Sequence, residues 1–406
     1  MTGTGRPAAA TSVRARAIRV GALAIAALAV GCAGSGKSYA CDLDAGPCNT
    51  TVTNDGGALP SFFGTPVLVA HDGLHDGFGD LAGFRGQIYA AFRRGKDRGY
   101  DGSAQVQIVR SADRGQTWQP VTTLSLPGFD LRDPKLAVFK DRLSVSFTAW
   151  DVKDPTKNRT FVRFAFSSDG QVFTLADAPL LPQASGLSAW RPRAKEGALW
   201  LPVWVADELF EHPELDHLSL LRSADGANFE LATTLPIGGG GFQPEVLVRA
   251  GGKLLLTAPE QAALGQPQRQ SFCQAPAAAP QSWSCWTVSG QHVETPALYE
   301  WNGLVLLAGK HDLGDGRKRT GLWQVFEDNR SLSLVAELDS FGDTGALGFY
   351  PLDADTALFA YHSTSRLDPK YLGLGHEPTE VETISIGLAS DVMAVSLSLR
   401  AAPIGN

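Results

Sequence analysis

Short apolar segments alternate with polar or glycine-containing turns along most of the chain. In six places an apolar segment follows a charged or glycine turn and is itself preceded by another apolar segment. This arrangement predicts a strand–turn–strand hairpin in each place. The anchor residues of the six segments are Ile88, Leu143, Leu199, Leu254, Leu304 and Leu358. Successive anchors are 55, 56, 55, 50 and 54 residues apart.

A spacing of about 50 residues gives each unit room for four strands. Six such units predict an all-β fold, a six-bladed β-propeller of four-stranded blades. A β-helix would need a far shorter period, and two packed sandwiches would not keep so even a spacing. No helical period of 3.6 residues recurs after residue 60.

A second repeat begins at Ser111, Ser167 and Ser223, which are 56 residues apart twice. The first copy ends at Trp118 and matches the Asp-box pattern S-x-D-x-G-x-T-W in full, and the other two are shortened variants with Phe in place of Trp. We expect the box to lie at a hairpin turn, where its Ser and Asp side chains bind backbone groups. Its aspartates are therefore interpreted as structural: Asp113, Asp169 and Asp225.

The first 32 residues predict an export signal. Four arginines precede an apolar run over 20–30, which is too short for a transmembrane helix and suits a signal peptide. The run ends at Cys32 in a sequence that resembles the lipobox of bacterial lipoproteins, which implies a lipid anchor on Cys32. Cleavage near Ala33 by an ordinary export pathway is the alternative. Residues 33–60 predict a flexible tether, and 61–406 the propeller.

Charge narrows the choice of partners. The formal net charge is −7, and without the four arginines of the signal peptide the chain carries 31 basic residues, down from 35, against 42 acidic ones. This balance argues against nucleic-acid binding, although local basic clusters can still bind an anionic ligand. We expect a monomer with no cofactor.

The remaining cysteines form two pairs that are close in sequence. In an exported chain these predict disulfides Cys41–Cys48 and Cys273–Cys285, although other pairings remain open. Between the second pair lies 274–280, in the place of a fourth Asp box, and we interpret it as a degraded hairpin. We expect no metal site, because neither the cysteine spacing nor that of His71, Asp72, His75 and Asp76 fits an established ligand set.

The repeat also predicts where a functional site lies. The start of the first strand and the end of the second lie at the same rim of each hairpin, so these positions converge on one central pocket. They carry carboxylates, cations and aromatic residues, which suit sugar binding or glycoside cleavage. The alternative for each of them is a structural ion pair. The set is Asp80, Arg93, Arg94, Arg132, Asp133, Trp150, Arg191, Trp204, Glu245, Glu260, Glu294, Lys310, His311, Tyr350, Tyr361 and His362.

The Asp boxes, the stretch 92–95 and the stretch 131–134 resemble the sialidase superfamily over roughly residues 65–365. The resemblance implies that Arg93 begins a carboxylate-binding arginine triad, although Gly95 stands where the family has proline. It also implies Asp80 as acid/base and a nucleophilic Tyr350 activated by Glu245, in keeping with the tyrosine nucleophile of sialidases. The expected substrate-binding residues are Arg93, Arg132, Arg191, Glu294, Lys310 and Trp150.

This sequence departs from the family in its arginines. The fourth and fifth blades offer no rim arginine and Lys310 occupies the fifth, whereas Arg132 and Arg191 come from the second and third. The leading hypothesis is a cell-surface exo-acting glycoside hydrolase for sialic-acid-like or other acidic glycans. The incomplete triad favours the alternative of a non-catalytic glycan-binding propeller. A cell-envelope assembly factor ranks last.

Overall fold

The structure is a computed structural model. It describes residues 53–54, 57–58, 62–99, 101–153, 160–176, 187–205, 218–237, 243–260 and 268–398. Two compact units divide the chain, Met1–Cys48 and Asn49–Asn406, and every described residue belongs to the second. The predicted signal peptide with Cys32, and the predicted pair Cys41 and Cys48, lie outside the described residues. Within those ranges, no helix is both long enough and apolar enough to cross a membrane.

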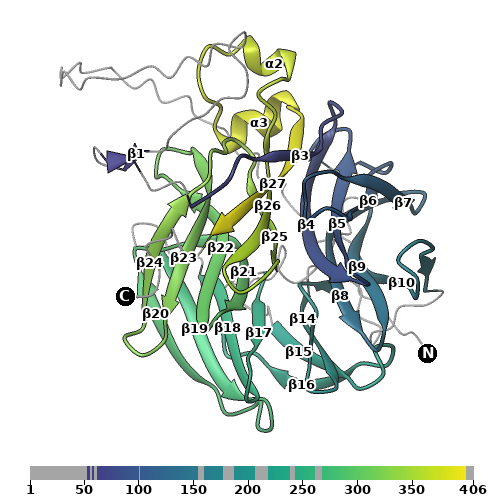
Figure 1. Ribbon diagram of the computed structural model, residues 1–406, viewed down its shortest axis with the longest axis vertical. Helices are drawn as coiled ribbons and strands as arrows, with labels where there is room; N and C mark the ends of the chain where they lie inside the picture. The colour runs from purple at the N-terminus through teal and green to yellow at the C-terminus, as the bar shows by residue number, and fades with distance from the viewer. Residues whose placement is uncertain are drawn as a thin grey trace, which may run out of the picture. The chain divides into compact units, whose positions relative to one another are not determined.

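The described part of this unit is built mainly of antiparallel sheet (Figure 1). Four sheets are separate and contain four or five strands each. The first two hold β8 (Phe129–Phe139), β9 (Arg142–Asp151), β10 (Thr160–Ser167) and β11 (Thr174–Leu175), then β12 (Leu187–Ala189), β13 (Arg193–Lys195), β14 (Ala198–Val205), β15 (Leu218–Ser223) and β16 (Glu230–Thr234). The other two hold β17 (Glu245–Val248), β18 (Lys253–Glu260), β19 (Arg269–Pro276) and β20 (Ser284–Ser289), then β21 (Val293–Trp301), β22 (Leu304–Asp312), β23 (Lys318–Phe326) and β24 (Ser331–Glu337).

A fifth, eight-stranded sheet combines strands from both ends of the unit. Its strands are β3 (Val67–Ala70), β4 (His75–Phe84), β5 (Gln87–Gly95), β6 (Gln105–Ser111), β7 (Gln119–Leu124), β25 (Gly345–Pro351), β26 (Thr356–Thr364) and β27 (Ser390–Ser398). A separate pair, β1 (Thr53–Asn54) and β2 (Gly57–Ala58), precedes them.

The innermost strands form a closed ring. Strand β4 contacts β8, β8 contacts β13, β13 contacts β17, β17 contacts β21, β21 contacts β25, and β25 returns to β4. Large apolar side chains fill the space between neighbouring sheets, as where Phe84 and Tyr89 pack with Leu136 and Phe147. The all-β propeller predicted from the repeat is therefore the fold of this unit.

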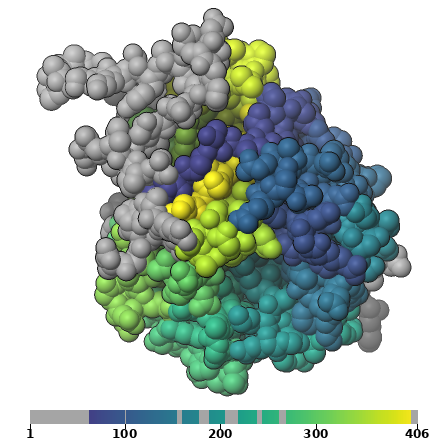
Figure 2. Space-filling view, viewed as in Figure 1, coloured from purple at the N-terminus to yellow at the C-terminus, as the bar shows by residue number. Residues whose placement is uncertain are grey.

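The prediction of six separate four-stranded blades is wrong, because the structure has four separate blades and one eight-stranded sheet. Strand β3 pairs with β27, and β27 meets β4 at a parallel bridge between Ser390 and His75. These contacts join the first and last repeat units into one sheet. Figure 2 shows the result on the surface, where N-terminal atoms in purple lie beside C-terminal atoms in yellow.

The Asp boxes lie at hairpin turns and hold neighbouring units together. In the first box, the Asp113 carboxylate accepts hydrogen bonds from the Thr117 amide and hydroxyl at 2.9 and 2.6 Å, and these contacts lower its pKa to about 2. In the second, Gly170 has a φ of +76°, and an added Cβ would lie 2.1 Å from the Tyr89 hydroxyl of the preceding unit. The box therefore needs glycine for both its turn and its contact.

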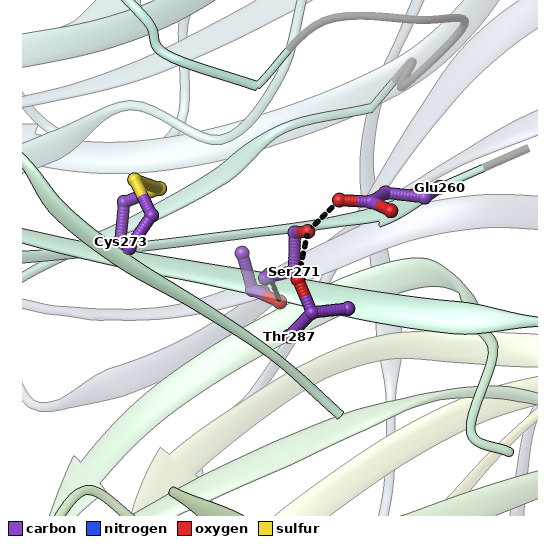
Figure 3. The surroundings of a disulfide bond; sticks show 6 residues. Glu260, Ser271, Cys273 and Thr287 are labelled. Carbon is purple, nitrogen blue, oxygen red and sulfur yellow. Dashed lines mark hydrogen bonds between the residues drawn. A yellow bond between two sulfur atoms is a disulfide. The ribbon is translucent and has the colours of Figure 1, made fainter. Parts of the chain in front are cut away.

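A disulfide joins Cys273 and Cys285 across the β19–β20 hairpin, as the sequence predicted for this pair. Figure 3 shows its surroundings, in which the Ser271 hydroxyl contacts both Glu260 and Thr287. Glu260 was one of the residues expected at the rim, and here its carboxylate accepts a hydrogen bond from the neighbouring strand β19.

Two short helices interrupt the last sheet between β26 and β27, a feature that the absence of a helical period did not predict. They are α2 (Pro369–Leu372) and α3 (Glu380–Ile386), and Figure 1 shows them beyond the end of the β26–β27 hairpin. Thr379 and Glu382 form a capping box at the start of α3. We call the residues from the end of β26 to the start of β27 the 365–389 segment.

Candidate functional site

Four innermost strands carry a β-bulge near the same end. The bulges lie between Gly77 and Asp80 in β4, between Arg132 and Lys135 in β8, between Glu294 and Ala297 in β21, and between Ala346 and Gly348 in β25. Inside the first three the left-handed residues are Phe78 (φ 53°), Asp133 (φ 50°) and Thr295 (φ 49°). Such backbone costs about 1 kcal/mol or more per residue and concentrates at functional sites. We call this end of the ring the rim.

A buried carboxylate organises the cations at the rim. Asp343 lies 2.8 Å from His75 Nε2, 3.0 Å from Arg98 Nε and 3.4 Å from Lys310 Nζ. Burial alone would raise the pKa of Asp343, but Arg98, Lys310 and the hydrogen bond from His75 hold it well below its ordinary value. Burial lowers the pKa of His75, and it lowers that of His362 to about 3. Both imidazoles are therefore neutral at pH 7.

The 365–389 segment adds a second carboxylate to the same cations. Glu380, the first residue of α3, forms ion pairs with Lys310 and, at 3.3 Å, with Arg98. Lys310 is almost fully buried, whereas Arg98 and Glu380 are partly exposed. Two carboxylates thus face two cations at this point of the rim.

Arg93 is at the rim, but its donors are used within the chain. Its Nε and Nη2 donate to both oxygens of Asp130 at 2.8 and 3.1 Å, and Nη1 donates to the Asp97 carbonyl at 2.9 Å. Arg132 also binds Asp130 and lies over the Trp150 ring at 5.8 Å. These residues hold the loop after β5, and so Arg93 is not presented as the clamp for a substrate carboxylate that the resemblance implied.

Two other rim carboxylates remain accessible and differ in their electrostatics. Asp133 is half-buried at its bulge, and burial raises its pKa in spite of Lys135, Arg132 and Arg98 nearby. Burial would also raise the pKa of Glu294, but Lys310 and Lys318 outweigh it and lower the pKa, with Lys318 Nζ donating at 3.0 Å. Burial therefore favours the protonated form of Asp133, whereas the two lysines favour the charged form of Glu294.

The predicted acid/base Asp80 and the predicted activator Glu245 lie in a different, closed cluster. Arg191 Nε donates to both oxygens of Asp80 at 3.0 Å, and its Nη1 donates to Glu245 at 2.9 Å. Asp80 also accepts backbone amides from Leu81 and Leu136, and Glu245 also pairs with Arg193. All three predicted site residues are at most 2% exposed. Arg191 therefore holds strands together instead of binding substrate.

Tyr350 is not placed as the predicted nucleophile. It lies near the hairpin end of β25, paired with Leu358, and packs against Gly83 at the far end of β4 from the rim. Its neighbours belong to an apolar cluster that includes Leu81 and Ile88. Both oxygens of Glu245 are bound by arginines, and the structure does not bring Tyr350 to them.

Sequence reasoning missed several rim residues. Arg98 lies in the loop after β5 and Lys318 at the start of β23, and neither is at a position counted from the anchors. Asp343 was overlooked because β25 begins at Gly345, five residues before the tyrosine that was taken as its start. His75 was weighed as a metal ligand and not as a member of the rim set, and the described residues contain no group of three or more His, Cys, Asp or Glu that could hold a metal ion. Glu380 lies in the 365–389 segment, where the capping box 379–382 was the available signal.

Comparison with known proteins gives the fold and no family. No protein-family model and no curated protein matches the chain. A protein of unknown function from Dyadobacter fermentans is 17% identical with a TM-score of 0.61, over 82% of this chain and 98% of that one. The α-L-arabinanase of Penicillium chrysogenum, complexed with arabinobiose, is 12% identical with a TM-score of 0.57, over 84% and 99%. Trypanosoma rangeli sialidase with the inhibitor DANA is 14% identical with a TM-score of 0.54, over 82% of this chain and 55% of the sialidase. At identities this low, the structural similarity shows a shared propeller fold alone.

Proposed function

We propose that this protein is a glycoside hydrolase whose active site is the rim. The observation that supports it most directly is the pair of accessible carboxylates, Asp133 and Glu294, whose pKa values shift in opposite directions. Glycosidic cleavage requires one carboxyl group that holds a proton and one that is charged. Solved structures with this fold include an arabinanase and a sialidase, which supports the same class of reaction.

In this proposal Asp133 is the general acid. It donates its proton to the oxygen of the departing group while the bond from that oxygen to the anomeric carbon breaks. Glu294 supplies the charged carboxylate, either as the base that activates water or as the nucleophile. The cations Lys310 and Lys318 keep Glu294 ionised.

Cations at the rim favour acidic glycans as substrates. Arg98 and Lys310 are the side chains best placed for this, because one of their two carboxylate partners, Glu380, lies on α3, outside the sheets. Arg93, Arg132 and Arg191 are bound instead to carboxylates of the ring. Export and lipid anchoring at Cys32, exo-acting cleavage at the cell surface and a monomeric state remain part of the proposal. We also propose that the eight-stranded sheet consists of two four-stranded blades joined edge to edge, since its two halves repeat the same hairpin order.

The test is hydrolysis by the full chain of fluorogenic glycosides, including an α-L-arabinofuranoside, a β-glucuronide and a sialoside. We expect release of fluorophore from at least one acidic sugar, and its loss in Asp133→Asn with the fold intact by circular dichroism. Full activity of Asp133→Asn would refute the assignment of the acid. Silence of the folded wild-type protein across the panel would refute hydrolysis of these sugars.

Glycan binding without hydrolysis is the second candidate. It is favoured by the closed cluster, since Arg191 takes up both Asp80 and Glu245, the carboxylates that the sialidase resemblance made catalytic. Saturable binding of an acidic glycan with no product after prolonged incubation would support it over the hydrolase.

A further inference from the structure

Arg98 and Lys310 are both bound by a carboxylate of the chain itself. Arg98 follows β5, Lys310 lies on β22, and the Glu380 carboxylate from α3 binds both. These three elements are far apart in sequence, so the contact depends on how the 365–389 segment lies on the ring.

Charge balance explains why a carboxylate is needed there. Arg93, the other nearby cation, is paired with Asp130, and the imidazoles of His75 and His362 have lowered pKa values. Arg98 and Lys310 have Asp343 and Glu380 as their contacting counter-ions, and Asp133 and Glu294 interact with them more weakly. Loss of a contacting counter-ion destabilises a buried cation. If Glu380 leaves, a carboxylate on the ligand restores the lost contact, whereas an uncharged sugar does not.

The two helices of this segment bury few side chains. Helix α2 buries no residue and α3 buries only Thr383. Val381 on α3 is 71% exposed. The apolar contacts of the segment lie outside α3, at Tyr371, which packs against Phe341, and at the buried Leu388 and Ala389 next to β27. Moving α3 away from the cations therefore exposes little apolar surface.

We infer that Arg98 and Lys310 form a carboxylate-binding position whose resting occupant is Glu380, and that a carboxylate-bearing sugar binds by displacing it together with α3. This inference rests on the proposed function only in taking a sugar as the ligand. One carboxylate replaces another, so the cations stay paired throughout. The segment thereby selects acidic over neutral sugars, because only an acidic one compensates for the loss of Glu380.

Titration calorimetry with D-glucuronate tests this, with D-glucose as the neutral comparison. We expect Glu380→Gln to bind glucuronate about tenfold more tightly than the wild type, because the internal competitor loses its charge and the open form is more populated. Glu382→Gln is the matched control. It removes the same charge from the same helix, keeps a capping-box side chain and lies outside the cation pair, so its affinity should equal the wild type's.

Arg98→Leu should weaken glucuronate binding at least about tenfold, since it removes a charge-assisted donor. Equal affinity of Glu380→Gln and wild type, equal binding of glucose, or no saturable binding of glucuronate by Glu380→Gln would each overturn the inference. Hydrolysis without preference for acidic sugars would support the proposed function and refute this position. Glucuronate binding as expected with no hydrolysis would support this position and refute the proposed function.

Discussion

Two clusters of charged residues lie along the ring, and they differ in how completely their charges are paired and buried. In the inner cluster, Arg191 bridges Asp80 and Glu245 and all three are almost fully buried. At the rim, Asp133 and Glu294 are partly exposed, and their pKa values shift in opposite directions. The same residue types are therefore structural where every charged group has a buried counter-ion. They are available for chemistry where the pairing of charges is incomplete.

The largest loss of stability is expected when Arg191 is removed from the inner cluster. Arg191→Ala leaves the buried Asp80 carboxylate without its arginine and Glu245 with Arg193 alone, which costs about 3–5 kcal/mol. Chemical denaturation would measure this as a lower free energy of unfolding. Arg98→Ala should cost less than this, because Asp343 keeps His75 and Lys310 as partners. Equal losses in the two variants would contradict the contrast.

A pH titration of stability should sharpen the comparison, because the rim also holds a buried acid without a hydrogen-bond partner. Both oxygens of Asp76 lack such a partner, with Arg94 Nε 4.0 Å away, and burial, followed by repulsion from Asp391, raises its pKa to about 7. The unfolded chain releases this proton near pH 4 and the folded chain near pH 7, so stability falls as pH rises between them, by roughly 4 kcal/mol. Asp76→Asn should flatten this fall in denaturation curves, and an unchanged slope would show that other groups cause it.

Neutralising the charged rim carboxylate should affect turnover more than stability. Glu294→Gln should lower kcat about a hundredfold, because an amide neither activates water nor attacks the sugar. Asp312→Asn is the matched control, since Asp312 shares Lys318 with Glu294. Steady-state kinetics on the best glycoside of the panel would show both. A similar loss in the two variants would point to a disturbed Lys318 instead.

The smallest effect is expected from the tyrosine that the sequence placed in the site. Tyr350→Phe removes a hydroxyl that lies at the far end of the strand from the rim. Turnover should change by less than about twofold, and stability by no more than about 0.5 kcal/mol. A hundredfold loss of kcat would restore Tyr350 as a catalytic residue.

The sequence predicted the features that depend on local repetition. The even spacing of apolar segments identified the hairpins and the propeller, and the frame Ser111–Trp118 identified an Asp-box turn. Both arise because turn residues and strand alternation act over a few neighbouring positions. The Cys273–Cys285 bond was found in the same way, from two cysteines on one hairpin.

Residues at the centre were harder to predict, for two physical reasons. Each bulge adds a residue to the strand, so counting from an anchor no longer tells which side chain reaches the rim. Thus Asp80, beyond its bulge, is in the inner cluster while Asp133 is in the bulge itself. Long-range contacts such as that of Glu380 with Lys310 depend on an insertion whose place on the ring no local pattern fixes.

The central claim, that Asp133 donates the proton in glycosidic cleavage, is tested most directly with two aryl glycosides of one sugar. One has a leaving group that needs protonation and the other a strongly acidic leaving group that does not. The account predicts that Asp133→Asn loses about 10²–10⁴-fold in kcat/KM on the first and little on the second. Equal losses on both substrates, or none on either, would contradict it.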